Sequence, residues 1–146
     1  MREIFAAIWQ AAASLLGVAV FAAIMWWVVK AHSRMWRLVA DRYSRPGGGP
    51  AIARKLETIV VTRRGPLGSL VTGNANYRQY PGTVMTVTQQ GLQLSQVPPL
   101  NVNCPRLFLP FDQMTLERTS WALWPEPFAI RMTNLPDIDI ILGREG

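Results

Sequence analysis

Residue types that carry chemistry are few in this chain and far apart. His32 is the only histidine, and no carboxylate lies within its helical turn. Cys104 is the only cysteine. A zinc site needs several such ligands. Asp137 and Asp139 share one face of an expected strand at an exposed edge of the sheet, but Ca²⁺ needs more oxygen ligands than these two residues provide. We therefore expect no enzyme, no metal or other cofactor, and no small-molecule substrate.

Two local motifs could still bind something. Gly47-Gly48-Gly49 is not a phosphate loop, because no strand precedes it and no Lys-Ser/Thr pair follows it. Trp121, Trp124 and Phe128 lie in a proline-rich segment between expected strands. These aromatic side chains either cap the core from outside or form an apolar contact loop for a partner.

The N-terminal segment has the composition of a membrane span. No charged residue occurs from Ile4 to Val29, and a span needs about 20 apolar residues. Trp26 and Trp27 followed by Lys30 match the aromatic belt and charged stop at a membrane interface. A cleaved signal peptide has a shorter apolar region and a small-residue cleavage site, which Met25-Trp26-Trp27 does not provide. We predict an uncleaved anchor over residues 1–29.

Flanking charges predict the orientation of this span. Arg2 is balanced by Glu3 before it, whereas Arg34, Arg37 and further arginines follow Lys30. Lys and Arg near a span stay on the cytoplasmic side. We expect a single-pass protein of the cell (inner) membrane, with the N-terminus outside and the C-terminal domain in the cytoplasm.

One stripe of the span could pack against another helix. Gln10, Ala13 and Gly17 share a helical face with Ala6 and Val20. The small residues at 13 and 17 permit close backbone approach, and Gln10 could hydrogen-bond across the contact. Alanine-rich spans also produce such spacing by chance, so the face stays a hypothesis.

Residues 30–45 continue a helical apolar spacing without glycine or proline and form a basic juxtamembrane helix. Residues 46–50, Pro-Gly-Gly-Gly-Pro, end it and are expected to be a linker. Residues 28–64, near the membrane, carry a net charge of +7, whereas residues 65–146 carry −1 and the whole chain +6. Anionic lipid headgroups attract such charges. Nucleic acid is not expected, because no binding module of basic and aromatic residues is recognisable.

Residues 51–146 read as a cytoplasmic β domain. β-branched runs at residues 57–62 and 83–88 and period-two alternation in the later runs predict about seven short antiparallel strands. The runs cover residues 57–62, 83–88, 92–94, 107–111, 114–116, 128–132 and 138–142. Turn signals separate them, at Gly65-Pro66, Tyr80-Pro81-Gly82, Pro98-Pro99, Pro125 and residues 134–137. The fold class is one N-terminal transmembrane α-helix plus a small antiparallel β domain, either a barrel or a sandwich.

The segment Gly91-Leu92-Gln93-Leu94, followed by residues 106–114 (Arg-Leu-Phe-Leu-Pro-Phe-Asp-Gln-Met), resembles the middle of bacterial PH-like and GRAM-like domains. It is also similar to uncharacterised bacterial single-pass membrane proteins that carry such a domain. The resemblance covers residues 83–119. It implies binding of lipid or protein rather than catalysis, and transfers no site residues. PH-like domains close one barrel end with a C-terminal helix, so here the barrel is either open or covered by residues 31–45.

These features together predict a non-catalytic, membrane-anchored interaction module. We expect an accessory or assembly subunit that docks on a larger membrane protein complex. The alternative is a PH-like domain that binds a lipid headgroup or a peptide at the cytoplasmic membrane face.

Overall fold

The structure is a computed structural model that describes residues 2–45, 47–63, 77–119 and 126–143, with only the backbone at Ala6 and Ala7. The chain forms two compact units, Met1–His32 and Ser33–Gly146. The helix α1 (Arg2–Tyr43) contributes to both.

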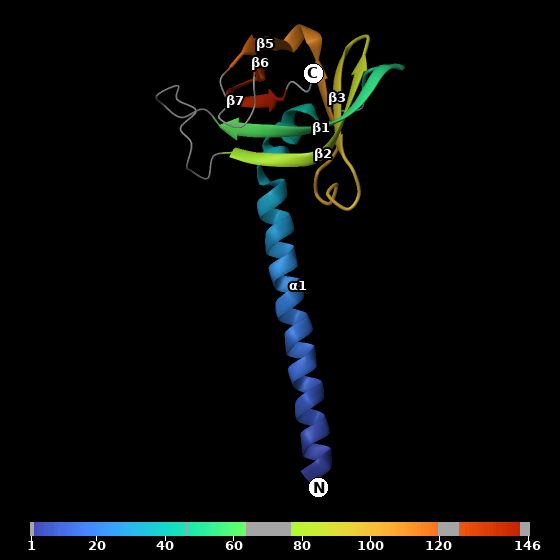
Figure 1. Cartoon of the computed structure of the whole chain (residues 1–146), viewed down its shortest axis with the longest axis vertical. Coiled ribbons are helices and arrows are strands. Elements are labelled where there is room, and N and C mark those ends of the chain that lie inside the picture. The colour runs from blue at the N-terminus through green and yellow to red at the C-terminus, as the bar shows by residue number, and fades with distance from the viewer. Residues whose placement is uncertain (1, 46, 64–76, 120–125, 144–146) are drawn as a thin grey trace. The chain divides into compact units, whose positions relative to one another are not determined.

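The first unit is the N-terminal part of α1 (Figure 1, blue). Its described side chains from Arg2 to Val28 are all exposed. Among the described residues, α1 is the one helix long and apolar enough to cross a membrane, judged by length and composition. The expected apolar N-terminal helix is therefore confirmed.

In the part of the second unit that the structure describes, seven strands and a short 3-10 helix follow α1. They are β1 (Ala51–Arg63), β2 (Tyr77–Thr88), β3 (Gly91–Gln96), β4 (Leu107–Pro110), η1 (Phe111–Gln113), β5 (Met114–Arg118), β6 (Phe128–Met132) and β7 (Leu135–Leu142). Each run expected from the sequence lies on one of these strands, except that the last residue of the run 107–111 belongs to η1. The expected antiparallel β domain is confirmed.

All seven strands belong to one antiparallel sheet with the order β4-β3-β2-β1-β7-β6-β5 (Figure 1). The sheet curls into a half-barrel rather than a closed barrel or a sandwich. In the chain, η1 connects the two edge strands β4 and β5, and hydrogen bonds join it to the β2–β3 turn and the β6–β7 turn. The Phe111 amide donates to the Gln90 carbonyl at 3.1 Å, and the Thr133 amide donates to the Gln113 carbonyl at 2.9 Å.

The C-terminal part of α1 completes the core of this half-barrel. Its buried side chains recur at helical spacing and form one apolar stripe: Met35, Trp36, Val39, Ala40 and Tyr43. They join a cluster with buried residues of six strands, including Ile59, Tyr80, Leu94, Leu107, Ile130 and Ile140. Of the two possibilities for the open side, the structure shows coverage by the N-terminal helix.

The domain therefore begins earlier than the sequence indicates. The sequence predicts a start at residue 51 and a separate juxtamembrane helix over residues 30–45. The compact unit instead starts at Ser33. Trp36 is fully buried and Val39 is 1% exposed, so these helical residues are part of the β domain's core.

The glycine-rich segment expected as a linker packs against the sheet. A Cβ atom added at Gly47 would lie 2.7 Å from Cδ1 of Phe108, and one at Gly48 would lie 3.0 Å from Cε2 of the same ring. A Cβ at Gly91 would lie 2.9 Å from Cζ of Phe108. The Phe108 ring thus occupies a cradle that exists because three glycines lack side chains.

Two expected turns have a different structure. Tyr80-Pro81-Gly82 lies inside β2, where the pairing with β1 shifts register between Glu57 and Ile59. This irregularity replaces the expected turn with a bulge, and Gly82 there has a φ of 67°. Residues 135–137 of the other segment already belong to β7, so that turn is shorter than expected.

Candidate functional site

The segment of α1 within the domain has a buried face and a basic face. Arg34 and Arg37 point away from the apolar stripe and are exposed. Arg42 and Arg45 are also exposed, at the far end of the segment. Trp26, Trp27 and Lys30, the other residues expected at the membrane interface, are exposed and belong to the first unit.

Asn103, in the loop between β3 and β4, clamps this basic face. Its Nδ2 donates to Oγ of Ser33 at 2.8 Å, and its Oδ1 accepts from Nη1 of Arg37 at 3.1 Å. Ser33 and Arg37 are one helical turn apart, so one amide side chain spans that turn. Asn103 has a φ of 59°, a left-handed conformation that asparagine tolerates better than most residues.

Trp36 supplies a second connection between this loop and the helix. Its indole Nε1 donates to the carbonyl of Pro105 at 2.6 Å. Its ring contacts the Tyr80 ring edge to face, with centroids 5.1 Å apart. The backbone amide of Trp36 donates to the Tyr80 hydroxyl at 2.8 Å. Loop, helix and β2 are therefore joined around one buried indole.

Burial dominates the electrostatics beneath the loop. It raises the pKa of Tyr80 well above the ordinary value, against the opposing effect of the Trp36 amide. Burial also raises the pKa of Cys104 to about 11. Cys104 is 5% exposed, so it is a buried free thiol, and a neutral thiol is a poor nucleophile.

The outer side of the same loop combines an apolar tip with basic neighbours. Val102 is 52% exposed, and Arg106 is also exposed. The loop is internally bonded, since the Val102 amide donates to the Pro99 carbonyl at 3.4 Å and the Cys104 amide to the Asn101 carbonyl at 3.0 Å. No sequence pattern predicts this surface, because only the fold brings Ser33, Arg37 and Asn103 together.

Two cavities adjoin the C-terminal end of α1. One, of about 400 Å³, is lined by Leu38, Arg63 and the start of β7; the other, of about 600 Å³, by Arg45, Phe108 and Gln113. Both share Asp41, Arg42 and Asn134. Charges of both signs line them, so they favour no single class of ligand. Within the part of the chain that is described, no three His, Cys, Asp or Glu residues gather as a metal site would need.

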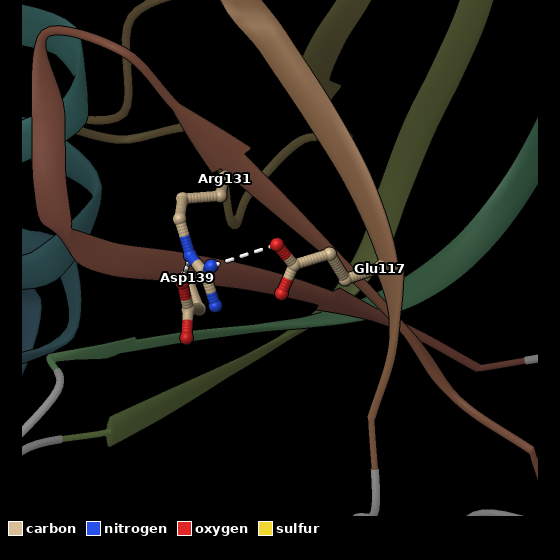
Figure 2. A network of polar contacts seen from close by, with 3 residues as sticks. All are labelled: Glu117, Arg131 and Asp139. Carbon is tan, nitrogen blue, oxygen red and sulfur yellow. Dashed lines mark hydrogen bonds and ion pairs between the residues drawn. The ribbon is translucent and has the colours of Figure 1, made fainter. Parts of the chain in front are cut away.

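Asp139 is buried in an ion network rather than exposed at an edge. β7 lies between β1 and β6, so the expected edge position is wrong. Figure 2 shows Arg131 between two carboxylates, with Nη1 2.8 Å from Oε1 of Glu117 and Nε 3.2 Å from Oδ1 of Asp139. The Arg131 guanidinium forms an ion pair with Asp139, which is 6% exposed, and so compensates a buried charge within the sheet.

The two remaining expected surfaces lie on other parts of the chain. Gln10, Ala13 and Gly17 are exposed, and a Cβ at Gly17 would meet nothing within 4 Å. Of the candidate contact loop, Trp121 and Trp124 lie outside the described residues. Phe128 is half-buried as the first residue of β6.

Known proteins add no assignment to this geometry. Comparison with protein-family models, curated proteins and solved structures finds no match. The expected resemblance to PH-like and GRAM-like domains therefore stays a prediction. The residues on which it was based, 83–119, cover the second half of β2, then β3, β4, η1 and β5.

Proposed function

We propose that this chain is a non-catalytic, membrane-anchored interaction module, an accessory or assembly subunit that docks on a larger membrane protein complex. One observation carries the proposal. The helix that is apolar enough to cross a membrane also supplies Trp36, Val39 and Tyr43 to the core of the β domain. The apolar segment and these core residues belong to one helix without a separate linker, as suits a protein whose folded domain must stay next to the membrane.

In this proposal the span docks through the face that contains Gln10, Ala13 and Gly17. Close helix packing in lipid depends on small residues that let two backbones approach. Ala13 and Gly17 provide this, and Gln10 provides a hydrogen-bonding group. The β domain lies in the cytoplasm, on the side of Lys30, Arg34 and Arg37.

Bulk added at Gly17 tests the docking face. Gly17→Leu should lower co-purification of the partner from mild detergent, because the lost packing is worth on the order of 1 kcal/mol, about fivefold in affinity. Val18→Leu, about 100° around the helix, is the matched control. Equal recovery of the partner with both variants would reduce the span to an anchor. A reporter fused after Gly146 that matures only in the cytoplasm checks the orientation.

A second function, binding of anionic lipid headgroups by a PH-like domain, is favoured by one specific observation. The exposed Arg34 and Arg37 follow the apolar segment within two helical turns. Anionic headgroups attract juxtamembrane basic residues, and added salt screens that attraction. Reconstituted full-length chain that shows no preference for anionic over neutral lipid would remove this candidate.

A further inference from the structure

We propose that the loop at residues 97–106, between β3 and β4, is a second membrane contact that docks on an anionic bilayer surface. Val102 enters the headgroup layer, while Arg34, Arg37 and Arg106 lie at the level of the lipid phosphates. The inference rests on the anchor of the proposed function and adds a site outside the span.

Chain connectivity keeps the loop near the expected membrane surface. Ser33 follows Val29, the last residue of the expected span, by four residues, and four residues reach at most about 14 Å even when fully extended. The polar headgroup layer is roughly 5–8 Å thick on each side of the hydrocarbon core. Asn103 bonds directly to Ser33 at 2.8 Å. The loop therefore stays within reach of the lipid headgroups.

The charges suit an anionic surface. Residues 33–40 and 97–106 contain no Asp or Glu, whereas Arg34, Arg37 and Arg106 are all basic and exposed. No carboxylate in either stretch would repel lipid phosphates. Basic residues near a cytoplasmic leaflet gain from its negative surface potential, and lose that gain in neutral lipid.

The apolar contribution comes from Val102 at the tip of the loop. Its side chain is 52% exposed between two asparagines, which is unfavourable in water and favourable at a lipid boundary. The bonds from Asn103 to the helix and from Trp36 to Pro105 hold the loop in place before any contact forms. Docking therefore requires little further ordering of the chain.

Spin labels on the full-length chain in nanodiscs test the proposal. Single cysteines at Val102→Cys, Ile52→Cys and Leu16→Cys are labelled, while the buried Cys104 stays in place. Collision with oxygen and with a water-soluble nickel chelate reports depth. We expect the position 16 label to be reached mainly by oxygen and the position 52 label mainly by nickel. In phosphatidylserine-containing discs, nickel should reach position 102 several-fold less than position 52.

The effect of charge on nickel access to the position 102 label shows whether lipid covers that position. In neutral phosphatidylcholine discs, or with Arg34→Gln and Arg106→Gln, nickel should reach position 102 more readily. Shielding that persists under both changes would indicate protein contact, such as a second copy, and would overturn the proposal. So would a position 102 label as accessible to nickel as position 52 while position 16 remains in lipid. A position 16 label in water would instead refute the anchor itself.

Discussion

At the scale of single residues, three side chains connect the helix to the sheet. The Tyr80 hydroxyl accepts a hydrogen bond from the Trp36 backbone amide, and the Trp36 indole donates one to the Pro105 carbonyl. The Asn103 side chain hydrogen-bonds to both Ser33 and Arg37. Each contact joins residues far apart in the sequence. Their loss should therefore loosen the packing of helix against sheet rather than alter either element alone.

Removal of the Tyr80 hydroxyl tests the central connection. Tyr80→Phe keeps the buried ring but deletes the acceptor for the Trp36 amide, so we expect about 1 kcal/mol lower stability. Tyr43→Phe is the control, because its hydroxyl meets Oε1 of Gln113 at a long 3.4 Å. Chemical denaturation of both variants in detergent gives the comparison. An equal loss in the two variants would contradict the special role of Tyr80.

Cys104 predicts a pH dependence. Because burial raises its pKa from about 9 to about 11, the folded chain holds this proton more tightly than the unfolded chain does. Its contribution to stability is complete below pH 9 and is lost as pH rises toward 11. Cys104→Ala should flatten the stability curve in this alkaline window, as measured by denaturation at several pH values. An unchanged slope would indicate that other groups cause it.

At the scale of elements, β-branched runs and period-two alternation together located the seven strands of the described residues. Alternation works because each strand presents one face to the core, as Ile138 and Ile140 do on β7. The bulge at Pro81-Gly82 could not be predicted, because it depends on the register against β1. Burial of Asp139 likewise depends on the position of β7 within the sheet, which alternation does not encode.

The glycine cradle around Phe108 predicts that a side chain added at Gly91 lowers the stability of the domain. A Cβ at Gly91 would collide with the backbone carbonyl of Leu109, and neither group can move without distorting the pairing of β3 with β4. Gly91→Ala should destabilise the domain by about 1–3 kcal/mol. Gly17→Ala lies outside the β domain, where a Cβ meets nothing within 4 Å, so this control should not lower the melting temperature of the domain. Thermal melts of the two variants compare the stability of the domain, and equal melting temperatures would contradict the prediction.

At the scale of the whole molecule, the largest difference between sequence and structure is the domain boundary. A helical apolar stripe after a span reads as a juxtamembrane helix, and only the curled sheet shows what that stripe packs against. The loop surface was missed for the same reason, because Trp36 and Pro105 are 69 residues apart. The expected span, by contrast, follows from composition and needs no tertiary information.

Truncation tests this boundary. A fragment of residues 33–146 should unfold cooperatively, because it contains the whole apolar cluster of the domain. A fragment of residues 51–146 lacks Trp36, Val39 and Tyr43 and should aggregate or melt without cooperativity. Circular dichroism melts of both fragments make the comparison. A cooperative melt of the shorter fragment would show that the helix is dispensable for the core.

The shared helix also has a consequence for synthesis. Trp36 leaves the ribosome before its partners Tyr80 and Pro105, which follow 44 and 69 residues later. During that interval its apolar stripe continues directly from the hydrophobic segment, with no tertiary contacts to hold it. The arginines at positions 34, 37 and 42 interrupt the hydrophobicity there, and charged residues resist entry into the bilayer. They would thus keep the future core in water until the last strands are made.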